Sequence, residues 1–476
     1  MAPPTAVAIH AITDTAAAAL PEPLTVDGVA KRRHAAGKLS GGVAAATSSD
    51  LFKGFGYCKQ RAKRWDGHLS KESRARQVRY SIRAPLVSMR MLSLGGGLPS
   101  SRYFPIEHLQ VKVPAVGHFS EEETKESGVV LKAGKYDLSE GKGLYERGDC
   151  ILSEEYTFAT AVETAAPMGV GVVGIKMDDQ GLLPEDMDDI LTSWDENERG
   201  GARKPRLLYT VPSGQNPTGA TQGLERRQAL YKVAQKHDVY ILEDEPYYFL
   251  QMEPYTTGGA LTASLPQTHG DFLKALVPSL LSMDVDGRVM RLDSFSKVIS
   301  PGSRVGWITA SEQVVERFVR HSEVSVQNPS GLAQLTLYKL LDESWGHEGF
   351  LDWLMHIRKE YTQRRDLILN ACEKHLPKDI VSWSPPMAGM FLWLKIDWTN
   401  HPEASGKDPV AIEGEIFQTC VDRGVLLSPG SWFRAEKFKH HDTLFFRATF
   451  AAAEGEQMEE AIRRFGGAVR GVFKIS

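Results

Sequence analysis

Short apolar runs alternate with amphipathic stretches along the middle of the chain, and this alternation limits the possible folds more than any other feature. Apolar runs predict strands, whereas apolar residues three or four positions apart predict helices. Strands are expected at 170–176, 206–211, 239–242, 288–292 and 305–309, and helices at 158–167, 185–192 and 224–237. Strand–helix alternation of this kind predicts an α/β domain with a mainly parallel central sheet.

The pattern changes after residue 311, where helical stretches come first and a mixed region follows. Helices are expected at 334–342 and at 350–373, and the second is long enough to bridge two lobes. Beyond it, strands at 391–396, 424–427 and 443–449 and helices at 410–422 and 456–464 predict an α+β lobe. The sequence therefore predicts a flexible N-terminal arm over 1–90, a large α/β domain over 91–330, and an interdomain helix with a small α+β domain over 331–476.

Charge and cysteine content exclude several classes of protein. Lysine and arginine number 56 against 60 acidic residues, a net charge of −4, which argues against a protein that binds nucleic acid by charge alone. The sequence contains no run of 18 apolar residues, so a membrane-spanning helix is not expected. Cys58, Cys150, Cys372 and Cys420 are widely scattered, so neither a metal site nor a disulfide framework is expected. We expect a reduced, cytoplasmic protein.

The strongest local motif is a lysine in a hydroxyl-rich loop directly after the expected strand at 288–292. Lys297 follows Ser294 and Ser296, and Arg304 lies seven residues further along. A lysine amine so placed could form an imine with an aldehyde cofactor. Two hydroxyls and a guanidinium beside it suit a phosphate group, which takes charge and directed donors. A solvent-exposed lysine in a polar loop is the alternative interpretation.

Two other loops strengthen the first interpretation, because each also follows an expected strand. The Gly/Pro-rich loop at 211–219 contains Asn216, whose amide could donate to a cofactor oxygen. The strand at 239–242 ends in three carboxylates, which are electrostatically costly together unless one of them meets a cation. The nitrogen of a pyridinium ring is such a cation, and Asp244 is the expected partner. Taken singly, the first loop could be a plain turn and the second an acidic rim.

Arg447 adds a possible substrate contact, because it lies inside an otherwise apolar strand. A buried guanidinium needs an anion. The α-carboxylate of a substrate would fit, since guanidinium binds carboxylate through a planar fork. An internal salt bridge would satisfy the same arginine. Together the loops offer the groups that one pyridoxal phosphate molecule requires.

At these residues the chain resembles the fold-type I, class I pyridoxal-phosphate aminotransferases, and in particular the fungal aromatic amino acid branch akin to kynurenine and 2-aminoadipate aminotransferases. The resemblance runs from about Ser93 to the C-terminus. It implies that Lys297 links to the cofactor and moves a proton, and that Asp244 pairs with the ring nitrogen. It further implies contacts to the cofactor from Phe158, Asn216, Tyr247, Ser294, Ser296 and Arg304, and to the substrate from Gly96, Gly97, Asn216 and Arg447.

The chain departs from the family pattern in one segment. Family members carry a long stretch, including a turn that binds the cofactor phosphate, where this chain has only the 12 residues 137–148. A skipped exon or faulty gene model would explain the loss, as would a variant that has lost part of the site. Under either explanation, the alternative to an active enzyme is a truncated, catalytically impaired protein that lacks part of the phosphate site.

The resemblance implies a homodimeric enzyme that moves the amino group of an aromatic or related L-amino acid to a 2-oxo acid such as 2-oxoglutarate. Neither nucleic acid nor membrane is expected as a partner. The same fold type also occurs in transcriptional regulators fused to a DNA-binding helix pair. The first 90 residues contain no convincing pattern of that kind, so a regulator remains a remote alternative.

Overall fold

A computed structural model describes residues 109–117, 119–120, 122–123, 129–133, 148–255, 268–437, 439–440 and 442–475 of the chain. Gly96, Gly97 and nearly all of 137–148 lie outside these ranges, as do the expected arm and its boundary. The domain limits therefore stay predictions. No helix in the described ranges is long and apolar enough to cross a membrane.

The larger of two lobes is built on a six-stranded sheet in the order β10-β9-β8-β7-β3-β4. Five strands run parallel, and β10 at the edge is antiparallel to β9. The strands are β3 (Cys150–Glu154), β4 (Gly171–Ile175), β7 (Leu207–Thr210), β8 (Tyr240–Asp244), β9 (Val289–Ser294) and β10 (Gly306–Thr309). The predicted α/β fold with a mainly parallel sheet is confirmed.

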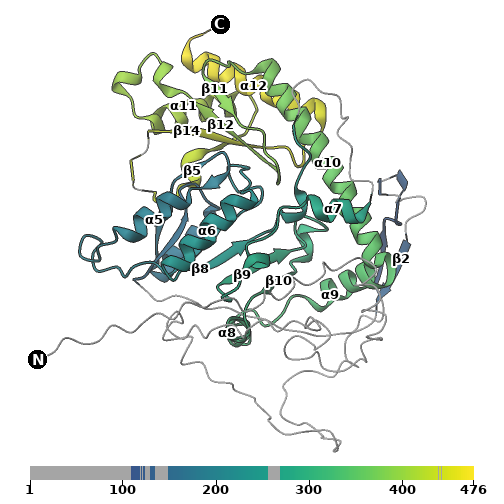
Figure 1. The fold of residues 1–476 in the computed structure, drawn as a ribbon. Helices are drawn as coiled ribbons and strands as arrows, with labels where there is room; N and C mark the ends of the chain where they lie inside the picture. Colours follow the sequence, from purple (N-terminus) through teal and green to yellow (C-terminus); the bar gives the residue numbers. More distant parts are fainter. Residues whose placement is uncertain are drawn as a thin grey trace, which may run out of the picture. The chain divides into compact units, whose positions relative to one another are not determined.

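Helices cover this sheet, because its central strands are apolar on both faces. All four residues of β7 are buried, as is typical of strands in parallel sheets. Figure 1 shows α5 and α6 lying side by side near β8. The helices of this lobe are α4 (Ala159–Ala165), α5 (Pro184–Thr192), α6 (Leu224–Lys236), α7 (His269–Ala275) and α8 (Glu312–Ser322). Residues of β7, β8, α5 and α6 share one apolar core.

The smaller lobe has a four-stranded antiparallel sheet in the order β11-β12-β14-β13. Its strands are β11 (Val381–Trp383), β12 (Phe391–Ile396), β13 (Ser428–Pro429) and β14 (Leu444–Thr449), and its helices are α11 (Pro409–Asp422) and α12 (Gly455–Phe473). The strands and helices of this lobe enclose a second apolar core.

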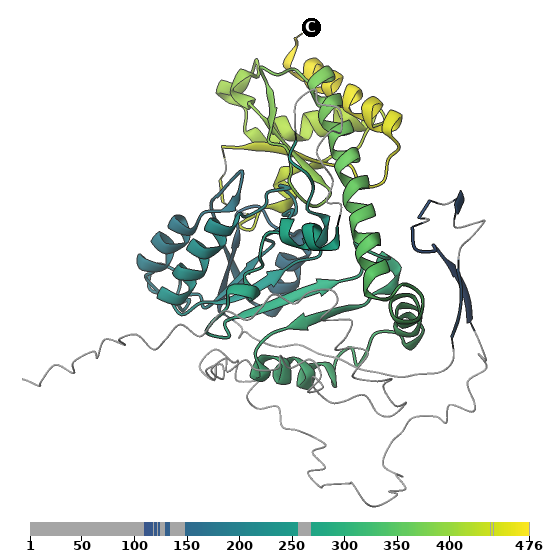
Figure 2. The ribbon, with the colours of Figure 1, turned by 45° about the vertical axis from the view of Figure 1, so that its right-hand side comes forward.

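A long helix joins the two lobes. It is α10 (Gly346–His375), which follows α9 (Gly331–Tyr338) and a π-helical turn at Lys339–Trp345. Both views show it running from beside β10 to the smaller lobe (Figures 1 and 2). The helix expected at 350–373 is therefore confirmed. Two further pairs of strands are antiparallel: β1 (Leu109–Val113) with β2 (Val129–Ala133), and β5 (Met177–Asp178) with β6 (Gly181–Leu182).

The strand expected at 424–427 is wrong. Gly424 adopts a left-handed backbone conformation with φ 68° at the end of α11, and Val425 N–H donates to Cys420 O to cap the helix. Val425 and Leu427 are buried in the small-lobe core without forming a ladder. Their alternation with exposed Leu426 therefore reflects a helix end and a connection, and strand pairing begins only at Ser428.

The helix expected at 456–464 continues to Phe473. Two consecutive glycines, Gly466 and Gly467, weaken the helical pattern in the sequence. Packing explains why the helix continues through them. A Cβ atom at Gly466 would lie 2.4 Å from His375 O at the end of α10, so the glycine allows the two helices to approach closely.

Candidate active site

The candidate site lies where neighbouring parallel strands of the large sheet end. The loops after β3, β7, β8 and β9 all leave the carboxyl edge of the sheet. The chain enters β4 on one side of β3 and later returns to β7 on the other side. Ligands of open α/β sheets bind at such a reversal of strand order. The topology therefore brings together the three loops that the sequence singled out.

Lys297 lies in the turn that joins β9 to the antiparallel edge strand β10. A hydrogen bond anchors this turn to α10: Trp353 Nε1 donates to the carbonyl of Val298, the residue after Lys297, at 2.5 Å. The Lys297 amine lies 6.0 Å from the centre of the Tyr247 ring. Lys297 is partly buried and forms no ion pair within the described ranges, so its amine is available for chemistry.

The predicted phosphate ligands cluster beside this lysine. Ser294 Oγ donates to Ser296 Oγ at 2.8 Å, and Ser296 N–H donates to Ser294 Oγ at 3.0 Å. Arg304 Nη1 donates to Ser296 Oγ at 3.2 Å and to Pro301 O at 2.8 Å. Arg304 is exposed and unpaired with any acid in the described part of the chain. Two hydroxyls and a guanidinium that has no acidic partner among the described residues form a set of donors that suits a phosphate.

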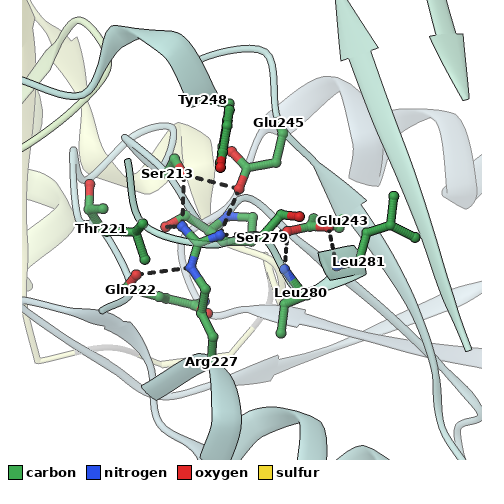
Figure 3. A network of polar contacts seen from close by, with 12 residues as sticks. Ser213, Thr221, Gln222, Arg227, Glu243, Glu245, Tyr248, Ser279, Leu280 and Leu281 are labelled. Carbon is green, nitrogen blue, oxygen red and sulfur yellow. Dashed lines mark hydrogen bonds and ion pairs between the residues drawn. The ribbon is translucent and has the colours of Figure 1, made fainter. Parts of the chain in front are cut away.

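Alternation along β8 separates the three carboxylates at its end onto two faces. Glu243 and Glu245 share a face with Arg227 of α6, whose side chain is wholly buried. Arg227 Nη1 lies 3.1 Å from Glu245 and 3.6 Å from Glu243. Figure 3 shows Arg227 pointing between Glu245 and Ser213, while Glu243 also accepts from the N–H groups of Leu280 and Leu281.

Asp244 lies on the opposite face of β8 and has no cation beside it in the described ranges. Its one hydrogen-bond donor there is the Tyr209 hydroxyl of β7, 2.7 Å from Asp244 Oδ2. Burial raises the Asp244 pKa to about 6; the Tyr209 hydrogen bond opposes this rise, and Glu245 and Asp293 add to it. A partly buried carboxylate that is surrounded by acids and lacks a cation is suited to a cationic ligand.

Arg447 of β14 is the reverse of Asp244: it is a cation without an acidic partner among the described residues. Its guanidinium carbon lies 4.4 Å from the centre of the Phe391 ring and 4.5 Å from that of Phe433. Its polar partners are Asn216 Oδ1 at 2.8 Å and Ser428 Oγ at 3.4 Å. No carboxylate pairs with it among the residues that the structure describes, so the predicted salt-bridge alternative finds no support. Burial lowers the Arg447 pKa, and an anionic ligand would oppose that shift.

Asn216 reaches Arg447 because its loop crosses from the large sheet to the small lobe. Gly214, with φ 58°, permits the crossing: a Cβ atom there would lie 2.5 Å from Gly389 N. Asn216 is buried, and its peptide bond to Pro217 is cis. Arg227 also holds this loop, since it donates to Pro212 O and Ser213 Oγ.

Aromatic contacts connect these groups into one set. Phe391, which lies against Arg447, also meets the Tyr247 ring edge-on at 5.8 Å between centres, and Tyr247 lies near Lys297. Phe158 stands immediately before α4 and is 37% exposed. Thr157, the residue before it, donates through its N–H to Phe433 O at 2.8 Å. No described contact joins Phe158 to Asp244 or Lys297, and its role stays a prediction.

Sequence reasoning missed four residues of this site. Tyr209 carries the donor to Asp244, and Phe391 and Phe433 flank Arg447. Tyr209 gave no distinctive signal, because tyrosine is common in strands and β7 also contains the hydroxyl of Thr210. Arg227 was missed as well, because nothing in an amphipathic helix distinguishes a buried arginine from an exposed one.

Comparisons with known proteins agree on one family. The family model for aminotransferases of class I and II matches residues 120–465. An aromatic amino acid aminotransferase of Schizosaccharomyces pombe is 39% identical over 468 positions, which take up 86% of this chain and 98% of that protein. An L-tyrosine:2-oxoglutarate aminotransferase of Serpula lacrymans is 42% identical over 301 positions, 60% of this chain and 56% of that protein.

A solved structure is similar over nearly its whole length. The crystal structure of aminotransferase Aro8 from Candida albicans has a TM-score of 0.79 and 36% sequence identity to this chain, and the match covers 87% of this chain and 100% of that one. The comparisons give no support to a regulator or to an impaired product.

The internal shortening expected at 137–148 stays a prediction, because nearly all of those residues lie outside the described ranges.

Proposed function

Because the chain belongs to the class I and II aminotransferases, which depend on pyridoxal phosphate, we propose that the loops after β7, β8 and β9 form its active site. In this proposal the enzyme moves the amino group of an aromatic L-amino acid to a 2-oxo acid such as 2-oxoglutarate. The substrates named for the two relatives support this assignment.

One observation carries the proposal. Of the three acids at the end of β8, Glu243 and Glu245 share the buried Arg227, whereas Asp244 has no cation in the described part of the chain. The residues present therefore fit the cofactor, which brings a ring nitrogen that can carry a proton. Ser294, Ser296 and Arg304 supply donors for its phosphate.

When bound, pyridoxal phosphate supplies a ring that withdraws electrons from the reacting carbon of the amino acid. The chain's own groups have separate tasks. Asp244, as a carboxylate, would hold the ring nitrogen in its protonated form. Tyr247 and Asn216 would contact the phenolic oxygen of the ring. Lys297 Nζ would hold the cofactor in the resting enzyme and would move the proton during transfer.

The surroundings of Arg447 support an aromatic substrate. Its guanidinium binds the substrate α-carboxylate as a two-pronged fork, while the Phe391 and Phe433 rings lie against both sides of it. Rings so close to the carboxylate site favour a substrate with an aromatic side chain. A homodimer and a cytoplasmic location, both implied by the family resemblance, complete the proposal.

A direct assay tests this function. The purified full-length chain, supplied with pyridoxal phosphate and 2-oxoglutarate, should form glutamate from L-tyrosine or L-phenylalanine. Since one amino group passes through one site, the kinetics should be ping-pong. Glutamate formed faster from an aliphatic donor such as L-alanine than from either aromatic donor would overturn the substrate assignment. No glutamate from any donor would overturn the proposed function.

Replacing Arg447 with lysine should raise KM for both the amino acid and the 2-oxo acid. Both substrates carry the same carboxylate, and the loss of a two-pronged charged hydrogen bond costs about ten- to a hundredfold in binding. Cofactor affinity should change little. Arg226→Lys is the matched control, because Arg226 pairs with Asp178 away from the site. Unchanged KM values in Arg447→Lys would remove Arg447 from substrate binding.

A further inference from the structure

The Tyr209 hydroxyl is placed to act on the cofactor through Asp244. In the ladder between β7 and β8, Tyr209 stands opposite Leu242. Asp244 is two residues beyond Leu242 and so projects from the same face. This diagonal relationship allows the long tyrosine side chain to reach the carboxylate, at 2.7 Å.

Tyr209 is held rigidly in this position. Its side chain is buried, and it packs in one apolar cluster with Val211, Tyr247 and Phe391. Burial raises the pKa of Tyr209 well above its ordinary value, with Asp244 the next cause. The hydroxyl therefore keeps its proton throughout the physiological range and acts as a donor.

The ionisable groups facing Asp244 otherwise oppose its charge. Glu245, the residue directly after β8, and Asp293 of β9 raise its pKa, and Asp244 itself raises the pKa of Tyr247. The nearby arginines are occupied by other acids: Arg227 contacts Glu243 and Glu245, and Arg291 binds Asp293 through two nitrogens. Glu154 of β3 lies further away, where it raises the pKa of Tyr209.

We propose that Tyr209 is a positioning residue of the cofactor site, whose hydroxyl keeps Asp244 ionised and aimed at the ring nitrogen. This inference rests on the proposed function. Among the described residues, Tyr209 is the one side chain that stabilises the Asp244 carboxylate by a hydrogen bond. Without the hydroxyl, the influences on Asp244 that remain are its burial and the like charges of Glu245 and Asp293. All three favour the protonated form of Asp244.

The direction of the pH effect follows from this arrangement. A cofactor with a protonated ring nitrogen binds the ionised carboxylate, so affinity is full above the Asp244 pKa and falls as the pH drops through it. The Tyr209 hydrogen bond lowers that pKa. In Tyr209→Phe the pKa rises, and the loss of affinity begins at a higher pH. A shift of one pKa unit weakens binding about tenfold in the acid range.

The chain offers a closely matched control. Tyr231 of α6 is also buried, and its hydroxyl donates to Asp284 Oδ1 at 2.8 Å, remote from the site residues. Tyr231→Phe therefore removes a buried tyrosine–aspartate hydrogen bond of the same geometry without touching Asp244. It separates the loss of a structural hydrogen bond from an effect on the cofactor.

The experiment measures the dissociation constant of pyridoxal phosphate between pH 5.5 and 8.5 for the wild-type chain and both variants, by titrating the apoenzyme. We expect Tyr209→Phe to bind about fivefold more weakly near pH 6, with a larger difference at pH 5.5 and a much smaller one near pH 8.5. Tyr231→Phe should follow the wild-type curve. The pH dependence is decisive, because a purely structural defect would weaken binding equally at every pH.

Three results would contradict the inference, and they are distinguishable. If Tyr209→Phe follows the wild-type curve, or if its curve is displaced equally at all pH values, Tyr209 does not act on Asp244 as proposed, while the function stands. If Tyr231→Phe shifts as much as Tyr209→Phe, the effect is not specific to the site. If the wild-type chain binds no cofactor, the proposed function fails, and the inference fails with it.

Discussion

Replacing Lys297 with alanine should reduce multiple-turnover transamination at least about a thousandfold, because both the covalent attachment of the cofactor and the proton transfer depend on one amine. The Lys297 turn lies between Ser296, with its phosphate donors, and Val298, which is anchored by Trp353. Truncating a partly buried lysine leaves that anchor in place, so the variant should fold and still bind cofactor without a covalent bond.

The control for this variant is Lys232→Ala, which removes an exposed lysine of α6. It should retain wild-type turnover. Steady-state assays with L-tyrosine and 2-oxoglutarate measure the effect, and circular dichroism checks that both variants are folded. Turnover in folded Lys297→Ala within tenfold of the wild type would mean that another amine carries the cofactor.

Replacing Asp244 with asparagine should lower kcat by about a hundred- to a thousandfold, since a fixed charge in a partly buried site stabilises a developing opposite charge strongly. Asparagine has nearly the same shape and can still accept the Tyr209 hydrogen bond, so the change isolates the charge. Cofactor affinity should also fall. Because the group that titrates near pH 6 is gone, the acid side of the cofactor-binding profile should flatten.

Asp284→Asn provides the comparison. Asp284 is buried and accepts hydrogen bonds from Tyr231 and from several backbone N–H groups, away from the site. Its replacement should lower the melting temperature but leave kcat per folded molecule unchanged. Equal losses of kcat in the two variants would show that Asp244 contributes to stability rather than to catalysis.

The sequence predicted most elements of the large lobe because their periodicity is strong and unambiguous. The expected helix at 224–237 corresponds to α6, and the expected strand at 206–211 to β7. Prediction failed where tertiary packing decides the outcome. Apolar residues at 425 and 427 contribute to a core without pairing, and Gly466 lies inside a helix because α10 approaches it closely.

Part of the candidate site was also predictable from the sequence, but from the chemistry of single residues and not from periodicity. Residues with distinctive chemistry at strand ends, such as Lys297, Asp244 and Asn216, could be found from order and composition. The partners that tune them could not, since Tyr209 and Phe391 resemble ordinary core residues until the strand register and the crossing of the two lobes are known. The predicted roles of Gly96 and Gly97 stay untested, because both lie outside the described ranges.

Peptide mapping after borohydride reduction tests the central claim most directly. Borohydride makes the attachment of pyridoxal phosphate to a protein amine permanent, and proteolysis with mass spectrometry then locates it. The account predicts one modified residue, Lys297, in the peptide that also contains Ser294 and Ser296. A label on another lysine, or no label in folded protein saturated with cofactor, would contradict it.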